Sequence, residues 1–482
     1  MKKLVNLTYP QKAILLTEQF YKNTAVNNIC GTAIIDSVLD FCALNKAINI
    51  VVKENDVFRT ILTKKSGEIK QFKTDYKETD FEIIDIKDKS EVKNIEDNLM
   101  KKPFHLLDSD LYEFKMFRFE DGCGGFLLNV HHVISDGWTL GLVCRKIMKA
   151  YSNIINNELS DENIEFSYLD YAESENEYIN STKFLKDKKY WEELFGDNIN
   201  PAVLPSDNQE KSAELSCLGE RLSFSISKAK MKLINEYCIK NKITVFNFFM
   251  AIYSIYISKI INSTDFSIGT PILNRTNFKE KNIAGMFVNV VPFRVQINPE
   301  FKFIEFVQDV AEETIGLLRH QKYPYQLLLE ELRKKDSSIP NLYNIVLSYQ
   351  ITKANNETEY KYSTRWAFNK HATDDISIQF LDLDEEGSLT VSYDFKKLKY
   401  SEDYIRSMNA RIFEMINKIL EVDNILIKDI EIITKQEKNK ILNNFNNTDF
   451  EYNKNKNVIK SFKEMVRKYP DKTAIIFENK KM

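Results

Sequence analysis

The sequence predicts a mixed α/β protein made of two lobes. Helical and strand patterns alternate over the first 175 residues and alternate again from about residue 222 onward, without an internal repeat of fixed period. The chain has 482 residues and is 43% hydrophobic, which is enough for a sizeable core and excludes wholesale disorder. We expect an N-terminal lobe over 1–175, a C-terminal lobe over 176–430, a linker over 431–457 and the beginning of another domain over 458–482.

In the first lobe, apolar spacing predicts helices that alternate with short strands. Pro10 stands near the first turn of one helix, where a missing N–H costs nothing. The turn residues Glu120, Asp121 and Gly122 join two strands into a hairpin. The expected helices are 10–21, 38–55 and 138–151, and the expected strands are 28–35, 58–63, 81–86, 111–119 and 125–130.

The second lobe follows a charged helical stretch at 181–196 and a polar connection at 198–210. The most apolar stretch, 243–257, is interrupted by polar residues and is shorter than the ~20 residues of a spanning helix, so we interpret it as a buried helix. Further helices are expected at 228–240, 245–261, 304–320 and 402–421, and strands at 222–226, 266–270, 288–295, 343–349, 376–383 and 389–395. Beyond residue 431, an Asn-rich stretch precedes a helix at 458–469 and a strand with nothing to pack on.

Charge and cysteine content exclude several classes of function. The chain has 67 Lys and Arg against 70 Asp and Glu, so its net charge of -3 argues against a general binder of nucleic acid or anionic membranes. The six cysteines form no CxxC pair, and the N-terminus turns polar too early for a secretory signal. We expect a cytoplasmic monomer with no membrane span and no nucleic-acid partner.

Two adjacent histidines, His131 and His132, end an apolar strand and precede Asp136 and Gly137 at the start of a helix. A strand-to-helix crossover presents an imidazole at a cleft, and a neutral imidazole accepts a proton near neutral pH. A buried, hydrogen-bonded histidine is the alternative. A metal site is disfavoured because no HExxH motif or Cys/His cluster occurs. No Gly-x-Ser-x-Gly elbow is present, so direct group transfer is the simpler interpretation. Asp136 is expected to pair with an arginine.

The segment His131–Trp138 (HHVISDGW) resembles the HHxxxDG signature of condensation domains in nonribosomal peptide synthetases. Two departures stand out: 54–56 reads Glu-Asn-Asp where Arg-His-Glu is usual, and 335–342 inverts the usual Asn-Pro order. The tail 458–477 resembles the beginning of an adenylation domain. The HHxxxDG segment is the third of the family's motifs, and 335–342 corresponds to the seventh. The first motif is resembled at 7–12, the second at 57–62, the fourth at 168–172, the fifth at 283–294 and the sixth at 320–325.

This resemblance implies a fold and a reaction. The fold is two chloramphenicol-acetyltransferase-like lobes in a V-shaped pseudo-dimer with a tunnel between them. Carrier proteins deliver thioesters on phosphopantetheine arms, and the domain itself holds no cofactor and no metal. His132 is then the main catalytic residue, which either takes the proton of the acceptor amine or positions that amine. His131 supports the loop, and Asp136 pairs with Arg59.

The remaining site residues follow from the same resemblance. Gly137 is expected to let the donor thioester approach the backbone, with its N–H facing the developing oxyanion. Trp138 at the helix start, and Asn289 and Arg294 in the fifth motif, are candidates for the substrate channel, with plain packing as the alternative for each.

The donor substrate is predicted from the N-terminus. The first motif begins within ten residues of Met1, and 12–32 resembles the opening of starter condensation domains, which acylate the first amino acid of a lipopeptide. We therefore expect acyl-CoA or an acyl carrier protein as donor and an aminoacyl group on a downstream peptidyl carrier protein, loaded by an adenylation domain, as acceptor. An elongating domain that joins peptidyl and aminoacyl thioesters, and a non-catalytic platform for carrier proteins, are the alternatives.

Overall fold

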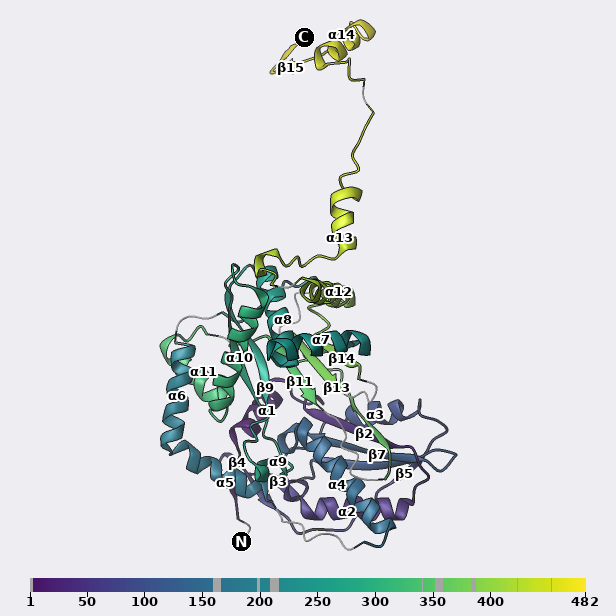
Figure 1. The fold of residues 1–482 in the computed structure, drawn as a ribbon, viewed down its shortest axis with the longest axis vertical. Helices are drawn as coiled ribbons and strands as arrows, with labels where there is room; N and C mark the ends of the chain where they lie inside the picture. Colours follow the sequence, from purple (N-terminus) through teal and green to yellow (C-terminus); the bar gives the residue numbers. More distant parts are fainter. Residues whose placement is uncertain are drawn as a thin grey trace. The chain divides into compact units, whose positions relative to one another are not determined.

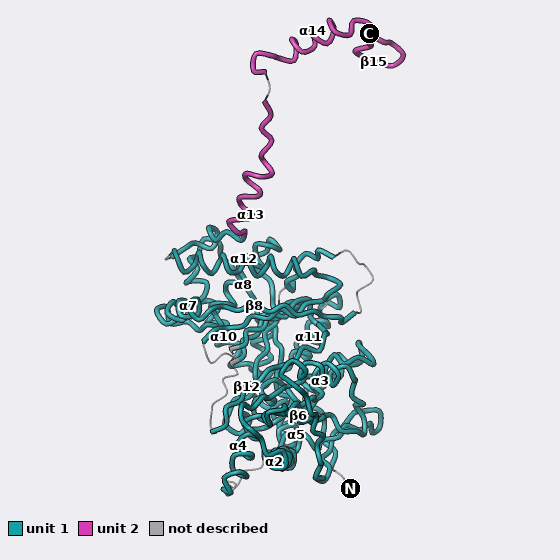
Figure 2. Tube along the Cα trace, turned by 90° about the vertical axis from the view of Figure 1, so that its right-hand side faces the viewer, with its two compact units in different colours: residues 1–432 teal, residues 433–482 magenta. Residues whose placement is uncertain are grey.

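A computed structural model describes residues 3–158, 166–196, 200–208, 216–339, 341–351, 359–382, 387–422, 424–451 and 453–482. Residues 1–432 form one compact unit and residues 433–482 form another (Figure 2). Part of the expected connection at 198–210, Pro340 of the seventh motif and the last residue of the expected strand 376–383 lie outside the described residues.

The N-terminal lobe is built on a five-stranded sheet with the order β12-β2-β7-β6-β5. Alternate residues of its strands enter two different cores, as the period of two requires. One core holds Ala33 and Leu128 with residues of α2 and α4, which lie side by side (Figure 1). The other core holds Leu127 with residues of α3. The elements are β2 (Asn28–Ile35), α2 (Phe41–Glu54), β5 (Ile83–Asp85), α3 (Val92–Met100), β6 (Tyr112–Arg118), β7 (Gly124–His131), α4 (Gly137–Ile155) and β12 (Tyr362–Ala367).

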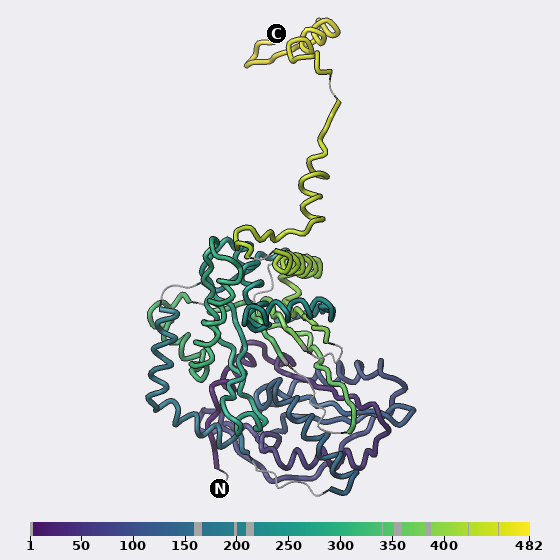
Figure 3. The backbone as a smooth tube through the Cα atoms, viewed as in Figure 1, coloured from purple at the N-terminus to yellow at the C-terminus, as the bar shows by residue number. Residues whose placement is uncertain are grey.

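The edge strand β12 comes from far along the chain. It lies within 176–430, yet it pairs antiparallel with β2, with Trp366 opposite Gly31 and Tyr362 opposite Ile35. Figure 3 shows this green segment beside the purple one. A small second sheet has the order β1-β4-β3, and its strand β1 directly precedes α1 in the sequence. Its strands are β1 (Val5–Asn6), β3 (Thr60–Lys65) and β4 (Glu68–Lys73), and α1 spans Tyr9–Phe20.

The C-terminal lobe is built on a six-stranded sheet with the order β10-β9-β11-β13-β14-β8. Helix α8 packs against α7, α10 and α12, and every residue from Phe248 to Ile257 is buried. A helix that is apolar on all sides belongs in a core, so the interpretation of 243–257 as a buried helix is confirmed. The elements are β8 (Gly219–Ile226), α7 (Lys228–Asn241), α8 (Val245–Ile261), β9 (Asp265–Ile272), β10 (Asn289–Gln296), α10 (Phe303–Arg319), β11 (Ile345–Ile351), β13 (Ile376–Asp382), β14 (Leu389–Lys396) and α12 (Glu402–Glu421).

Three further helices contact one another in a row. They are α5 (Tyr168–Ile179), α6 (Thr182–Leu194) and α11 (Tyr325–Lys335). Helix α5 packs on β1, α6 packs on α5 and α11, and α11 packs on β10. The short second unit carries α13 (Lys435–Asn439), α14 (Val458–Lys468) and a two-residue ladder of β15 (Ile476–Phe477) and β16 (Lys480–Lys481). Apolar residues of α14, such as Val458 and Phe462, are exposed within this unit.

Candidate active site

The histidine loop, which we define as His131–Asp136, joins the buried strand β7 to the long helix α4. A single 3-10 turn, η2 (His132–Ile134), carries the chain from one to the other. Asp136 is the N-cap of α4, where its Oδ1 accepts the Thr139 N–H at 2.9 Å. Such a cap satisfies one of the free N–H groups of the first turn, and the carboxylate also suits the positive end of the helix dipole. The sequence S-D-G-W therefore fixes where the helix starts.

His131 is buried and held at both ring nitrogens. Its Nδ1 accepts the Val133 N–H at 3.1 Å, and its Nε2 lies 3.1 Å from Oε1 of Glu18 on α1. Because Nδ1 accepts, the hydrogen-bond network assigns the proton to Nε2, which donates to the carboxylate. Burial alone would raise the pKa of Glu18, but its hydrogen bonds from His131 and Asn27 outweigh burial and lower that pKa. These contacts fit the supporting role expected for His131.

His132 differs from its neighbour in how its ring is held. Its backbone N–H donates to the Asn27 carbonyl at 2.8 Å, which fixes the main chain. Its buried Nδ1 makes no hydrogen bond of normal geometry with any described residue. Burial lowers the pKa of His132, against the opposing effect of the Asp136 carboxylate. The imidazole is therefore neutral at physiological pH and has a lone pair available to accept a proton.

Asp136 is fully buried and forms a bidentate ion pair with Arg275, which follows β9. The Arg275 Nη1 lies 2.7 Å from Oδ2 of Asp136, and Nη2 lies 3.1 Å from Oδ1. The backbone N–H groups of Phe287 and Val288 also donate to Oδ2, at 3.0 and 3.3 Å. Burial would raise the pKa of Asp136, but the Arg275 charge and these hydrogen bonds hold it below its usual value. The carboxylate is a structural anchor between the two lobes.

The expected pairing of Asp136 with Arg59 is wrong. The Arg59 guanidinium donates instead to the backbone carbonyls of Lys53, at 2.9 Å, and Thr74, at 3.4 Å. Arg59 lies in the 3-10 turn η1 (Asp56–Arg59) next to β3, where it braces the second motif. The sequence pattern correctly requires an arginine for a buried carboxylate, but it does not say which one.

Motifs that lie far apart in the sequence meet around this loop. Gln11 of the first motif donates from Nε2 to the Val133 carbonyl at 3.0 Å. Tyr168 of the fourth motif donates from its hydroxyl to the Met286 carbonyl of the fifth motif at 2.7 Å. Gly285 has φ +159°, and a Cβ there would lie 2.1 Å from the Tyr168 ring. The first, third, fourth and fifth motifs therefore form one connected cluster.

The structure gives a steric reason for a glycine at position 137, which the sequence alone did not reveal. A Cβ on this residue would lie 2.4 Å from the indole of Trp366 on β12, a distance that no side chain tolerates. The glycine thus allows the crossing strand to lie against the first turn of α4. The expected roles of Gly137 toward the donor thioester and the oxyanion remain predictions.

The three channel candidates lie in different surroundings. Trp138 donates from Nε1 to the Lys281 carbonyl at 2.9 Å and lines a pocket described below. Asn289 donates to the Tyr323 carbonyl at 3.2 Å. Arg294 pairs with Asp265, with 2.7 Å between Nη2 and Oδ2, and also donates to the Leu194 carbonyl. These bonds favour packing roles for Asn289 and Arg294, and their part in a channel stays a prediction.

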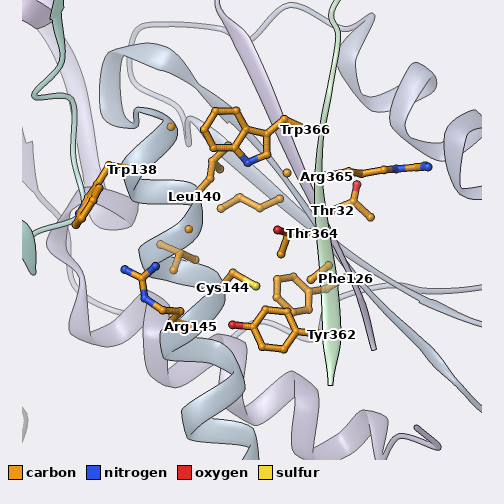
Figure 4. Close-up of a pocket in the computed structure, with 16 residues that line it drawn as sticks. Thr32, Phe126, Trp138, Leu140, Cys144, Arg145, Tyr362, Thr364, Arg365 and Trp366 are labelled. Carbon is orange, nitrogen blue, oxygen red and sulfur yellow. The ribbon is translucent and has the colours of Figure 1, made fainter. Parts of the chain in front are cut away.

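An apolar pocket of about 70 Å³ lies between the first two turns of α4 and the strands β2, β7 and β12 (Figure 4). Trp366 marks one end of the pocket, and Phe126 and Tyr362 mark the other (Figure 4). Arg365 points away from it, toward Glu96 at 2.7 Å. The Cys144 thiol faces it, and burial raises the pKa of this thiol to about 12, so it stays neutral. The lining residues are Gly31, Thr32, Ala33, Phe126, Leu128, Gly137, Trp138, Leu140, Gly141, Val143, Cys144, Arg145, Tyr362, Thr364, Arg365 and Trp366.

Metal-ligand clusters and membrane-spanning helices are two other features that could mark a function. The described residues contain no group of three or more His, Cys, Asp or Glu side chains arranged to hold a metal ion. No single helix among them is long and apolar enough to cross a membrane, and only α7 and α8 together reach that length, with a bend of 100° between them.

Comparison with known proteins identifies the family. A model of the condensation domain matches residues 1–442. Surfactin synthase subunit 1 of Bacillus subtilis (strain 168) is 32% identical over 481 residues, which are 98% of this chain and 13% of that protein. Tyrocidine synthase 3 of Brevibacillus parabrevis is 24% identical over 473 residues, 97% of this chain and 7% of that protein. The chain thus spans only a small part of either relative.

Solved structures share the fold. The starter condensation domain of rhizomide synthetase, a mutant in complex with C8-CoA, superposes with a TM-score of 0.79 at 18% identity, over 89% of this chain and 98% of that one. The first condensation domain of the CDA synthetase gives a TM-score of 0.74 at 17% identity, over 90% of this chain and 99% of that one. These matches confirm the predicted α/β fold class. The match of the family model over residues 1–442, together with the shared fold, shows that the chain belongs to the condensation-domain family of nonribosomal peptide synthetases.

Proposed function

We propose that this protein is a starter condensation domain, which transfers a fatty acyl group from acyl-CoA or an acyl carrier protein to the α-amine of an aminoacyl thioester. Condensation domains form amide bonds, so the family sets the type of reaction. The observation that carries the choice of donor is the apolar pocket, which begins at Gly137, directly after the histidine loop. A hydrocarbon chain gains roughly 0.8 kcal/mol for each CH₂ that leaves water. Leucine, valine and aromatic side chains supply such surroundings here.

In this proposal the amine nitrogen attacks the thioester carbon, a C–N bond forms, the C–S bond breaks, and the thiol leaves. The proton lost by the amine goes to His132 or to the departing thiolate. The neutral imidazole of His132, with its lowered pKa, suits either proton transfer or positioning of the amine. The Gly137 N–H, at the positive end of α4, faces the developing oxyanion.

The acceptor and the neighbouring domains are part of the same proposal. The aminoacyl group is carried by the phosphopantetheine of a downstream peptidyl carrier protein, and residues 458–482 begin the adenylation domain that loads it. The family model ends at residue 442, whereas the alignment with surfactin synthase subunit 1 covers 98% of this chain. The exposed apolar residues of α14 support the idea that further chain packs on this helix.

The test offers two donors to the purified protein, together with an aminoacyl carrier protein. One donor is a medium-chain acyl-CoA and the other is a peptidyl carrier protein. Formation of the N-acyl aminoacyl carrier from acyl-CoA is the expected result. A product from the peptidyl donor alone would refute the starter type and establish an elongating domain. Binding of carrier protein without any product would establish a non-catalytic platform.

A further inference from the structure

We propose that Asp56, in the part of the second motif that departs from the family pattern, is a positioning residue that holds the fifth motif against the histidine loop. This inference needs only the formation of an amide bond, so it holds for either type of donor and does not rest on the starter assignment. Asp56 lies in the 3-10 turn η1, where it is only 1% exposed, and it reaches the site through the first turn of α5.

The carboxylate of Asp56 binds the first turn of α5 through three hydrogen bonds. Its Oδ1 accepts the Tyr168 N–H at 2.9 Å. Its Oδ2 accepts the Leu169 N–H at 3.2 Å and the Ser167 hydroxyl at 2.7 Å. A carboxylate that leaves water needs such donors, and the N-terminus of a helix also supplies the positive end of the helix dipole. Asp56 thereby fixes where α5 begins and where the backbone of Tyr168 lies.

Tyr168 connects the start of α5 to the fifth motif. Its hydroxyl donates to the Met286 carbonyl at 2.7 Å and lies 3.1 Å from Oγ1 of Thr8. Its ring lies directly against the backbone of Gly285, where a Cβ would come within 2.1 Å of it. Because Tyr168 is fully buried in a close-packed interior, a shift of α5 is passed on to residues 285 and 286.

The backbone of residues 285–288 is in turn the seat of the histidine loop. The Gly285 N–H donates to Oγ1 of Thr139 at 2.9 Å, and the Phe287 N–H donates to Oδ2 of Asp136 at 3.0 Å. Asp136 ends the loop that carries His132, so a displaced seat moves the imidazole relative to the reacting groups. A misplacement of about 1 Å from a distant change can cost about 10²-fold in rate.

The neighbouring residue Asn55 contacts the same region from α4. Its Oδ1 accepts a hydrogen bond from Nζ of Lys146 at 2.8 Å, and that Nζ also lies 3.4 Å from the Asn282 carbonyl. Residues 55 and 56 thus hold both α4 and α5 next to the segment that leads into the fifth motif. The departure from the usual Arg-His-Glu therefore keeps a carboxylate at residue 56, where that carboxylate has donors to bind.

The first experiment measures amide formation on an aminoacyl carrier protein, with whichever of octanoyl-CoA or a peptidyl carrier protein gives product with the wild type. Asp56→Asn replaces an acceptor oxygen with an NH₂ group that faces donors, and we expect it to lose about tenfold or more in kcat while KM for the aminoacyl carrier stays within about twofold. Asp56→Glu keeps the carboxylate and should keep kcat within about threefold. Thr244→Ala is the matched control, because it removes the cap of α8, at which Thr244 accepts the Asn247 N–H at 3.1 Å. It should keep the wild-type kcat.

Hydrogen–deuterium exchange of the same proteins, read by mass spectrometry, shows how far the effect of Asp56 extends. A purely local role would speed exchange only in peptides that cover 167–172, at the start of α5. Asp56→Asn should also speed exchange in peptides that cover 283–290, because the N–H groups of Gly285 and Phe287 lose their fixed acceptors. This measurement needs no substrate.

The combined results decide the inference. Faster exchange at 283–290 together with a lower kcat supports it. An effect confined to 167–172 with an unchanged kcat would overturn it, as would an equal loss of kcat in Thr244→Ala or in Asp56→Glu. If Asp56→Asn does not fold, Ser167→Ala removes only the hydroxyl donor at 2.7 Å and should give the same pattern with a smaller loss.

Discussion

The buried ion pair between Asp136 and Arg275 gives the most specific structural prediction. Both side chains are fully buried, and Arg275 makes two contacts to the carboxylate at 2.7 and 3.1 Å. Removal of one partner leaves an uncompensated charge, which costs about 3–5 kcal/mol. We expect Arg275→Met to lower the free energy of unfolding by that amount, whereas Arg275→Met combined with Asp136→Asn should cost less than the sum of the two changes.

Urea denaturation of the four proteins of this double-mutant cycle, followed by tryptophan fluorescence, measures the coupling. Arg59→Met is the matched control, because Arg59 bonds backbone carbonyls and leaves Asp136 fully paired. Its effect should add to that of Asp136→Asn within about 0.5 kcal/mol. Additive effects of Arg275 and Asp136, or strong coupling of Arg59 with Asp136, would refute the assignment of the partner.

Three further predictions concern the histidine loop: two test contacts that support it, and the third tests the protonation of His132. Glu18→Gln removes the charged acceptor of the His131 Nε2–H and should lower the free energy of unfolding by about 1–2 kcal/mol, measured by the same denaturation; an unchanged midpoint would contradict it. Gly137→Ala places a Cβ 2.4 Å from Trp366 and should lower the free energy of unfolding by about 1–3 kcal/mol. Adding Trp366→Leu to the same protein should recover most of this stability. If stability is not recovered, the clash with Trp366 is not the cause of the loss. Burial lowers the pKa of His132, so its imidazole becomes protonated only below about pH 6.5. As the pH falls below the amine pKa of ~8, the logarithm of kcat/KM should fall with slope one, because only the amine is being protonated. The slope should become two only below the pKa of His132, where both groups are protonated. A steeper fall already at pH 7 would argue against a lowered pKa.

The elements that could be predicted are those whose signal is local. The helices Val245–Ile261 and Glu402–Glu421 and the strand Asn28–Ile35 have the expected boundaries, because apolar periodicity and N-cap residues such as Thr244 and Ser401 mark them. Strand β12 was missed, because its sequence YSTRWA has little alternation and its partner β2 is more than 300 residues away. Nothing within the segment itself indicates that pairing.

The residues of the candidate site also fall into two groups: those that a local sequence motif predicts, and those that only the fold brings to the site. The histidine pair and Asp136 were found because they lie together in one short motif. Arg275 and Glu18 were missed, because each reaches the loop only through the fold, and Glu18 on α1 has the pattern of an ordinary solvated helix residue. The choice of Arg59 came from the resemblance alone, and the geometry of β3 and η1 directs its guanidinium to Lys53 and Thr74. Gly137 was recognised, but its contact with Trp366 depends on the missed strand.

The most direct test of the account is a single-turnover reaction of octanoyl-CoA with an aminoacyl carrier protein, read by the intact mass of the carrier. With wild-type protein the account predicts a carrier that gains one octanoyl group. With His132→Ala, shown to be folded by its circular dichroism and unfolding midpoint, it predicts no gain. Turnover at the wild-type rate by the folded His132→Ala variant would contradict the account, as would wild-type protein that transfers the octanoyl group neither from octanoyl-CoA nor from an octanoyl acyl carrier protein.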